Sequence, residues 1–190
     1  MVSTKSQIKR SHLELLYHIS RELSSRLDLR ELIERILRLT SESLSAENGS
    51  LILIGDDGQV YDAALIINGA LVPDAEAQLG PQLERWLAGW ALRQRQVVVS
   101  QDTANDPRWQ PAENSQPAES KSALSAPLIF AERVLGVLTL VHPQPSYFGE
   151  DHQQLLKAIA EQAAVAVENA RLLRESRRQT QNLRSLVEVA

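Results

Sequence analysis

The chain closes with a segment, Glu150 to Ala190, that contains neither glycine nor proline. Its apolar residues recur at helical spacing, at Leu155, Ile159, Ala163 and Ala166. At about 1.5 Å per residue, a helix of this length measures about 60 Å, roughly twice the diameter of a small domain. The segment therefore predicts a helix whose C-terminal half projects from the fold that precedes it.

The projecting part of this helix carries a stripe with alternating steps of four and three residues, as in a coiled coil. The stripe consists of Leu172, Ser176, Gln179, Leu183, Leu186 and Ala190. A second amphipathic helix is predicted before Asp28, with Leu13, Leu16, Leu23 and Leu27 on its apolar face. These leucines need a partner surface, so the sequence predicts a homodimer formed through its terminal helices.

Between the terminal helices, the apolar pattern changes between helical spacing and short β-type runs. Asp28 and Glu31 have the spacing of a capping box, and Asp56-Asp57-Gly58 is typical of a hairpin turn. The predicted elements are a helix over Leu29 to Leu44, strands over Ser50 to Ile54 and Val60 to Ile67, a helix over Leu83 to Arg93, and strands over Val97 to Val99, Ala123 to Phe130 and Val134 to Val141. We therefore divide the chain into an N-terminal dimerisation helix (1–28), a core (29–149) and a long signalling helix (150–190).

Four short motifs in this order resemble the GAF domain family. They are Leu87-Ala88-Gly89-Trp90, Asp102 followed by Asn105-Asp106-Pro107-Arg108, the pair Ala126-Pro127-Leu128 and Gly136-Val137-Leu138, and Phe148 with Ala160, Ala166, Asn169 and Ala170. The resemblance covers about Leu13 to Leu173. It implies an α+β fold, of sandwich type, in which an antiparallel sheet carries helices on its faces and the loop from Asp102 to Ser122 covers a small-molecule pocket.

The same resemblance supplies the candidate ligand-binding residues. They are Trp86, Trp90, Asp102, Asp106, Arg108 and Trp109. Each has a structural alternative: Asp106 before Pro107 is well suited to cap a turn, with Arg108 paired to a carboxylate, and the tryptophans are common fillers of a small core. Many relatives have glycine where this chain has Trp86, which predicts a narrowed pocket mouth.

Composition excludes several functions. The formal charge of −4 comes from residues of both signs spread along the chain, so nucleic acid is a poor partner. No stretch reaches the roughly 20 apolar residues of a membrane span, and no signal peptide begins the chain, so a cytoplasmic location is expected. The four histidines share no metal-ligand spacing.

The chain contains no cysteine. Cysteine is required by the relatives that reduce methionine sulfoxide, and it commonly attaches the pigment in bilin-binding relatives. Other relatives bind cyclic nucleotides with a motif that includes a phenylalanine and an acidic pair. The motif is incomplete in this chain, because the acidic pair Glu150-Asp151 follows Phe148 too closely. No set of acid, base and nucleophile is visible, so we expect no enzyme activity.

The sequence therefore predicts a sensory domain of a bacterial type of signalling protein. Its ligand, and any cofactor, are unknown, and its signal would pass through the helical dimer. The alternative is a structural spacer whose pocket is filled by its own side chains. Because Asn182 to Ala190 repeats the apolar pattern of His12 to Ser20, we also expect a further sensory or output domain downstream in the parent chain.

Overall fold

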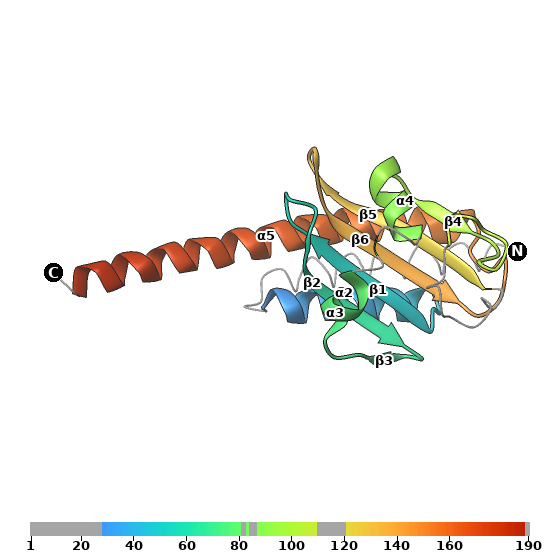
Figure 1. Cartoon of the computed structure of the whole chain (residues 1–190), viewed down its shortest axis with the longest axis horizontal. Helices are drawn as coiled ribbons and strands as arrows, with labels where there is room; N and C mark the ends of the chain where they lie inside the picture. Colours follow the sequence, from blue (N-terminus) through green and yellow to red (C-terminus); the bar gives the residue numbers. More distant parts are fainter. Residues whose placement is uncertain (1–27, 81–82, 84–86, 110–120, 189–190) are drawn as a thin grey trace, which may run out of the picture.

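A computed structural model describes residues 28–80, 83, 87–109 and 121–188, and the side chains in this range as far as residue 181. Figure 1 shows an antiparallel sheet with helices on its two faces and one long helix that continues beyond the sheet. The predicted α+β fold is confirmed. The predicted N-terminal helix over 1–28 lies almost wholly outside the described residues.

The sheet has six strands in the order β3-β2-β1-β6-β5-β4, and every neighbouring pair is antiparallel. The strands are β1 (Asn48–Ile54), β2 (Val60–Ile67), β3 (Ala70–Leu71), β4 (Val98–Ser100), β5 (Ser122–Phe130) and β6 (Arg133–His142). The last two strands in the sequence, β5 and β6, lie between β1 and β4 in the sheet. The two hairpins β1–β2 and β5–β6 therefore lie side by side at the centre of the sheet.

One face of the sheet is covered by α2 (Leu29–Ser43) and by the first half of α5 (Glu150–Glu188). The α2 helix begins where the sequence predicts, because the Asp28 carboxylate accepts a hydrogen bond of 2.8 Å from Leu29 N–H. Small side chains let α5 lie close to the strands, since Ala160, Ala163 and Ala164 are buried beside Leu156. This face holds the larger of the two apolar clusters.

The opposite face is covered by α3 (Ala75–Leu79) and α4 (Leu87–Gln94). Side chains alternate between faces along each strand, so Ile52, Ala123 and Val137 point to this side and pack with Leu87 and Ala91 of α4. The sequence did not predict α3 or β3. Both are too short for their periodicity to be detected.

A charged contact connects helices on the two faces. Arg30 of α2 donates from Nη1 to the Ala63 carbonyl (3.1 Å), places Nε 2.9 Å from Asp62 Oδ1, and forms an ion pair with Glu76 of α3. The pKa of Asp62 is raised, mainly because the carboxyl group is buried, while the positive charge of Arg30 acts in the opposite direction. Arg30 therefore joins α2, β2 and α3 around an edge of β2.

The centre of the sheet depends on one glycine. Gly136 of β6 pairs with Leu53 of β1 on one side and with Leu128 of β5 on the other. A Cβ atom at Gly136 would overlap the carbonyl oxygen of Ile52, which belongs to the backbone and cannot rotate away. The close approach of β1 to β6 therefore requires glycine at this position.

We predict that Gly136→Ala lowers the free energy of unfolding by about 3 kcal/mol, because β1 and β6 must move apart to admit the methyl group. Urea denaturation at neutral pH measures this value. Gly80→Ala is the matched control, since a Cβ there meets nothing within 4 Å. Equal stability of the two variants would contradict the assignment of Gly136 as the contact that sets the spacing of the strands.

Candidate functional site

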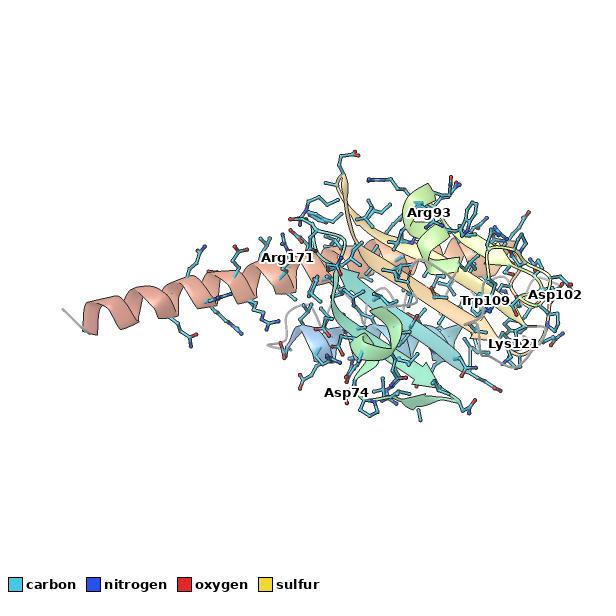
Figure 2. All side chains as sticks on the ribbon, in the orientation of Figure 1. Asp74, Arg93, Asp102, Trp109, Lys121 and Arg171 are labelled. Carbon is cyan, nitrogen blue, oxygen red and sulfur yellow. The ribbon has the colours of Figure 1, made fainter. Side chains whose placement is uncertain are left out.

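The loop that follows β4 contains four of the predicted site residues, and its two described ends are joined. Thr103 N–H donates to the Lys121 carbonyl (2.9 Å), and Lys121 N–H donates to Thr103 Oγ1 (3.2 Å). Asp102 accepts bonds from Ala104 N–H (3.1 Å) and from the Asn105 amide (2.7 Å). Figure 2 places Asp102, Trp109 and Lys121 together at the end of the sheet opposite to the end from which α5 projects.

Asp106 and Arg108 form an ion pair with several hydrogen bonds in this loop. Oδ1 of Asp106 accepts from Arg108 N–H and from Nε (2.9 Å each), and Oδ2 accepts from Nη2 (2.7 Å). Arg108 Nη2 also donates to the Val99 carbonyl (2.9 Å), so the guanidinium fastens the loop to β4. With Pro107 at the second position and a bond of 2.9 Å from Trp109 N–H to the Asp106 carbonyl, the segment is a β-turn. These contacts fit the structural alternative for Asp106 and Arg108.

The predicted tryptophans are not brought together by the described structure. Trp90 lies on α4 with 39% of its surface exposed, and the Arg93 guanidinium lies 5.4 Å from the centre of its ring. Trp109 is half-buried and packs against the apolar cluster under α3 and α4. Trp86 lies outside the described residues. Trp109 therefore packs against the face of the sheet under α3 and α4, from the loop that the resemblance makes the cover of the pocket.

A row of hydroxyl groups crosses that same face, and the sequence analysis did not identify it. Ser50 of β1 pairs with Thr139 of β6, which pairs in turn with Ser125 of β5. All three residues are buried, and the Ser125 and Thr139 hydroxyl oxygens lie 2.7 Å apart. Each lies two residues from an apolar member of the cluster under α4, so the row shares its face. Strand register was the missing information, because the three residues are far apart in sequence.

The hydroxyl row is covered in this structure. Ser125 has no exposed surface and Thr139 has 5%, and the neighbouring Val137 and Ala123 are fully buried. Two open grooves of about 510 Å³ each lie elsewhere, one between β5 and α5 beside Lys157 and one beside Ser41 at the end of α2. Neither groove is lined by a predicted site residue. A ligand on the hydroxyl row would need the residues that bury it to move.

The described residues offer no centre for a metal ion. Within these ranges, no three residues among histidine, aspartate and glutamate come together as ligands. Nor does any helix in the same part of the chain combine the length and the apolar character needed to cross a membrane.

The ion pair in the loop gives a pH-dependent prediction. The hydrogen bonds from Arg108 hold the pKa of Asp106 at about 2, below its ordinary value of 3.8. A carboxyl group whose pKa is lowered by folding stabilises the fold above its unfolded pKa, and this contribution is lost as the pH falls from about 4 to about 2. Asp106→Asn should therefore lower the free energy of unfolding by about 2 kcal/mol at pH 7.

The difference between the wild-type chain and Asp106→Asn should shrink as urea denaturation is repeated at lower pH. Asp57→Asn is the control. Asp57 also accepts a hydrogen bond from a backbone N–H two residues later, that of Gln59 at 3.0 Å, but it pairs with no arginine in the described structure. If Asp106→Asn lowers the free energy of unfolding at pH 7 by no more than Asp57→Asn does, the contact with Arg108 adds no stability.

Several known structures have the same architecture. The GAF domain of a phosphoenolpyruvate-protein phosphotransferase from Coxiella burnetii is 18% identical over 86% of this chain and 96% of that one, with a TM-score of 0.66. The GAF domain of the corresponding Acinetobacter protein has the same identity and a TM-score of 0.64, with 86% and 97% of the two chains covered.

A third similar structure is the free methionine-R-sulfoxide reductase of Neisseria meningitidis in complex with its substrate. It is 17% identical over 85% of this chain and 91% of that one, with a TM-score of 0.62. No curated protein matches the chain by sequence. At these identities the structural matches establish the fold alone.

The sequence itself carries the family assignment. The family model described as "GAF domain" matches residues 26–168, which include α2, the whole sheet and the first half of α5. The match and the architecture agree on the same limits of the globular part. The chain therefore belongs to the GAF domain family.

Proposed function

We propose that this chain is a non-catalytic sensory domain of a signal-transduction protein, in which a small polar molecule binds over the hydroxyl row and the signal leaves through α5. GAF domains generally serve as sensory or regulatory modules in signalling proteins. The observation that carries the proposal is the pair of buried hydroxyls at Ser125 and Thr139, in the middle of an otherwise apolar face. A cytoplasmic location stays a prediction.

The chemistry of the row favours a ligand that can form hydrogen bonds. When one of the two hydroxyls donates to the other, the acceptor still has its own hydrogen atom to donate. A ligand with an acceptor group would satisfy it, while Val137 and Ile52 on the same face would contact an apolar part of the ligand. Trp109, at the rim of this cluster, is the described aromatic residue best placed to report binding.

The proposal assigns no reaction to the site. The Neisseria meningitidis neighbour is a free methionine-R-sulfoxide reductase, but reductases of this family depend on cysteine, and the present chain has none. The ion pair between Asp106 and Arg108 is used internally to fasten the turn to β4. We therefore infer binding without catalysis.

The second candidate is a structural spacer with an occluded pocket, and one observation favours it. The hydroxyl row and its apolar neighbours have almost no exposed surface, and the side chains of α4 pack against those neighbours. A spacer needs only the fold and a dimer interface. The two candidates differ in whether any small molecule stabilises the domain.

Both candidates include dimerisation through α5. The stripe begins within the globular part, because Val165 and Leu172 are 36% and 50% exposed and lie seven residues apart. Ser176 and Gln179 continue it on the projecting half of the helix, where the described side chains are exposed. This continuity supports a parallel pairing of α5 with its copy, which the sequence predicts the N-terminal helices to join.

The first prediction concerns the ligand. A panel of small polar metabolites should contain at least one compound that raises the melting temperature and changes the tryptophan fluorescence of the wild-type chain. Thr139→Val should weaken that binding about tenfold, because it removes one hydrogen bond to the ligand while it keeps the shape of the side chain.

Thr40→Val is the control for this test. Thr40 is equally buried on the opposite face and donates to the Ile36 carbonyl at 2.6 Å, so its loss should affect stability and leave binding unchanged. If no compound stabilises the wild-type chain, the occluded spacer is the better account. If both variants bind equally well, the ligand does not lie on the hydroxyl row.

The other prediction concerns the dimer. Leu172→Glu should convert the homodimer to a monomer at micromolar concentration, since it places a charge in the apolar stripe. Light scattering measures the mass, and Arg178→Glu, an exposed change on another side of the same helix, is the control. A wild-type chain that is already monomeric, with an ordered helix by circular dichroism, would contradict the dimer.

A further inference from the structure

Among its described side chains, the α5 helix carries one buried charge, and this charge lies where the helix leaves the sheet. Glu168 is the last buried residue among the described side chains of α5, and its side chain is 7% exposed. Leu172 and Leu173, one turn later, are about half exposed. A buried carboxylate is unfavourable unless it is paired and hydrogen-bonded, so its partners determine whether this end of the helix can stay in place.

Two arginines supply those partners. Arg171, on the same helix, donates from Nε to Glu168 Oε2 and from Nη2 to Oε1, both at 3.0 Å. Arg133, the first residue of β6, donates from Nη1 to Glu168 Oε1 at 3.4 Å. One contact is therefore internal to α5, and the other joins α5 to the sheet.

Arg133 also reaches the neighbouring hairpin. Its Nη2 donates to Oδ1 of Asp56 at 2.7 Å, and Asp56 lies in the turn between β1 and β2. The hydrogen bond from Arg133 lowers the pKa of Asp56. We use the name exit clamp for these four residues, Asp56, Arg133, Glu168 and Arg171. Figure 1 shows both hairpin turns at the end of the sheet from which α5 projects, and Figure 2 places Arg171 at the same end.

The two ion pairs that Arg133 forms in the exit clamp differ in how much they stabilise the end of α5. Asp56 is 82% exposed, so its ion pair with Arg133 is worth little, as is usual for surface pairs. Glu168 is buried, and loss of a charged partner there has a much larger effect. The contact between Arg133 and Glu168 is therefore the one that matters for the helix.

We propose that the exit clamp holds the projecting half of α5 in a fixed direction and rotation relative to the two central hairpins, so that a shift of β6 moves the helix. Strand β6 itself connects the two regions, because Thr139 of the hydroxyl row and Arg133 of the clamp lie on it about 20 Å apart. The coupling is a property of the fold with or without a ligand. It therefore goes beyond the proposed sensory function and can be tested separately.

The absence of cysteine from the chain allows a direct test in the intact protein. Spin labels are attached at Gln94→Cys on α4 and Arg177→Cys on the projecting helix, both exposed positions. Labelled chains are diluted with unlabelled chains so that only distances within one chain are measured by pulsed electron resonance. The wild-type clamp should give one narrow distance distribution.

Glu168→Gln and Arg133→Ala should each broaden this distribution. They should also speed amide exchange over residues 169–177 about tenfold, the effect of losing one charged hydrogen bond, without a change over residues 151–160. Glu161→Gln is the matched control, because Glu161 is an exposed carboxylate two turns earlier on the same helix. A general loss of stability would instead raise exchange along the whole helix.

The proposal would be overturned if the spin-label distance distributions of Glu168→Gln and Arg133→Ala were as narrow as that of Glu161→Gln. If Glu168→Gln fails to fold, Arg133→Ala alone decides, since Glu168 then keeps its bonds to Arg171. Uniform acceleration of exchange from residue 151 to residue 177 would also count against the clamp, because it would indicate a stabilising role without a directional one.

Discussion

The structure depends on the burial of the first half of α5 against the sheet. Leu156, Ile159, Ala163 and Val167 are fully buried there, and they complete the larger apolar cluster together with α2. The same helix then continues for several turns with none of the other described helices or strands beside it (Figure 1). One rigid element is thus part of the core at one end and free to meet a partner at the other, which is the arrangement that a relay needs.

The two faces of the sheet have different tasks in this account. The face under α2 and α5 is apolar and supplies stability, whereas the face under α3 and α4 contains the hydroxyl row and the loop fastened by Asp106 and Arg108. Strand β6 has neighbours on both sides, and its side chains reach both faces. Gly136 keeps β6 close to β1, so a displacement of one central hairpin is expected to move the other.

Sequence reasoning predicted most of the fold because its signals are local. The Asp28 cap, the β1–β2 turn and the length of α5 each follow from neighbouring residues, and the structure contains all three. The site was predicted less completely. Ser50, Ser125 and Thr139 meet only through strand register, and Glu168 meets Arg133 only because α5 crosses the end of β6. Such contacts between distant residues leave no periodic pattern in the sequence.

The central claim is that binding on one face changes the helix on the other. Hydrogen exchange of the dimeric wild-type chain, with and without a compound that stabilises it, tests this claim most directly. The account predicts slower exchange in β6 around Thr139 and, in the same sample, altered exchange in α5 from Glu168 onward. Protection confined to β6 with no change in α5, or protection on another surface alone, would contradict it.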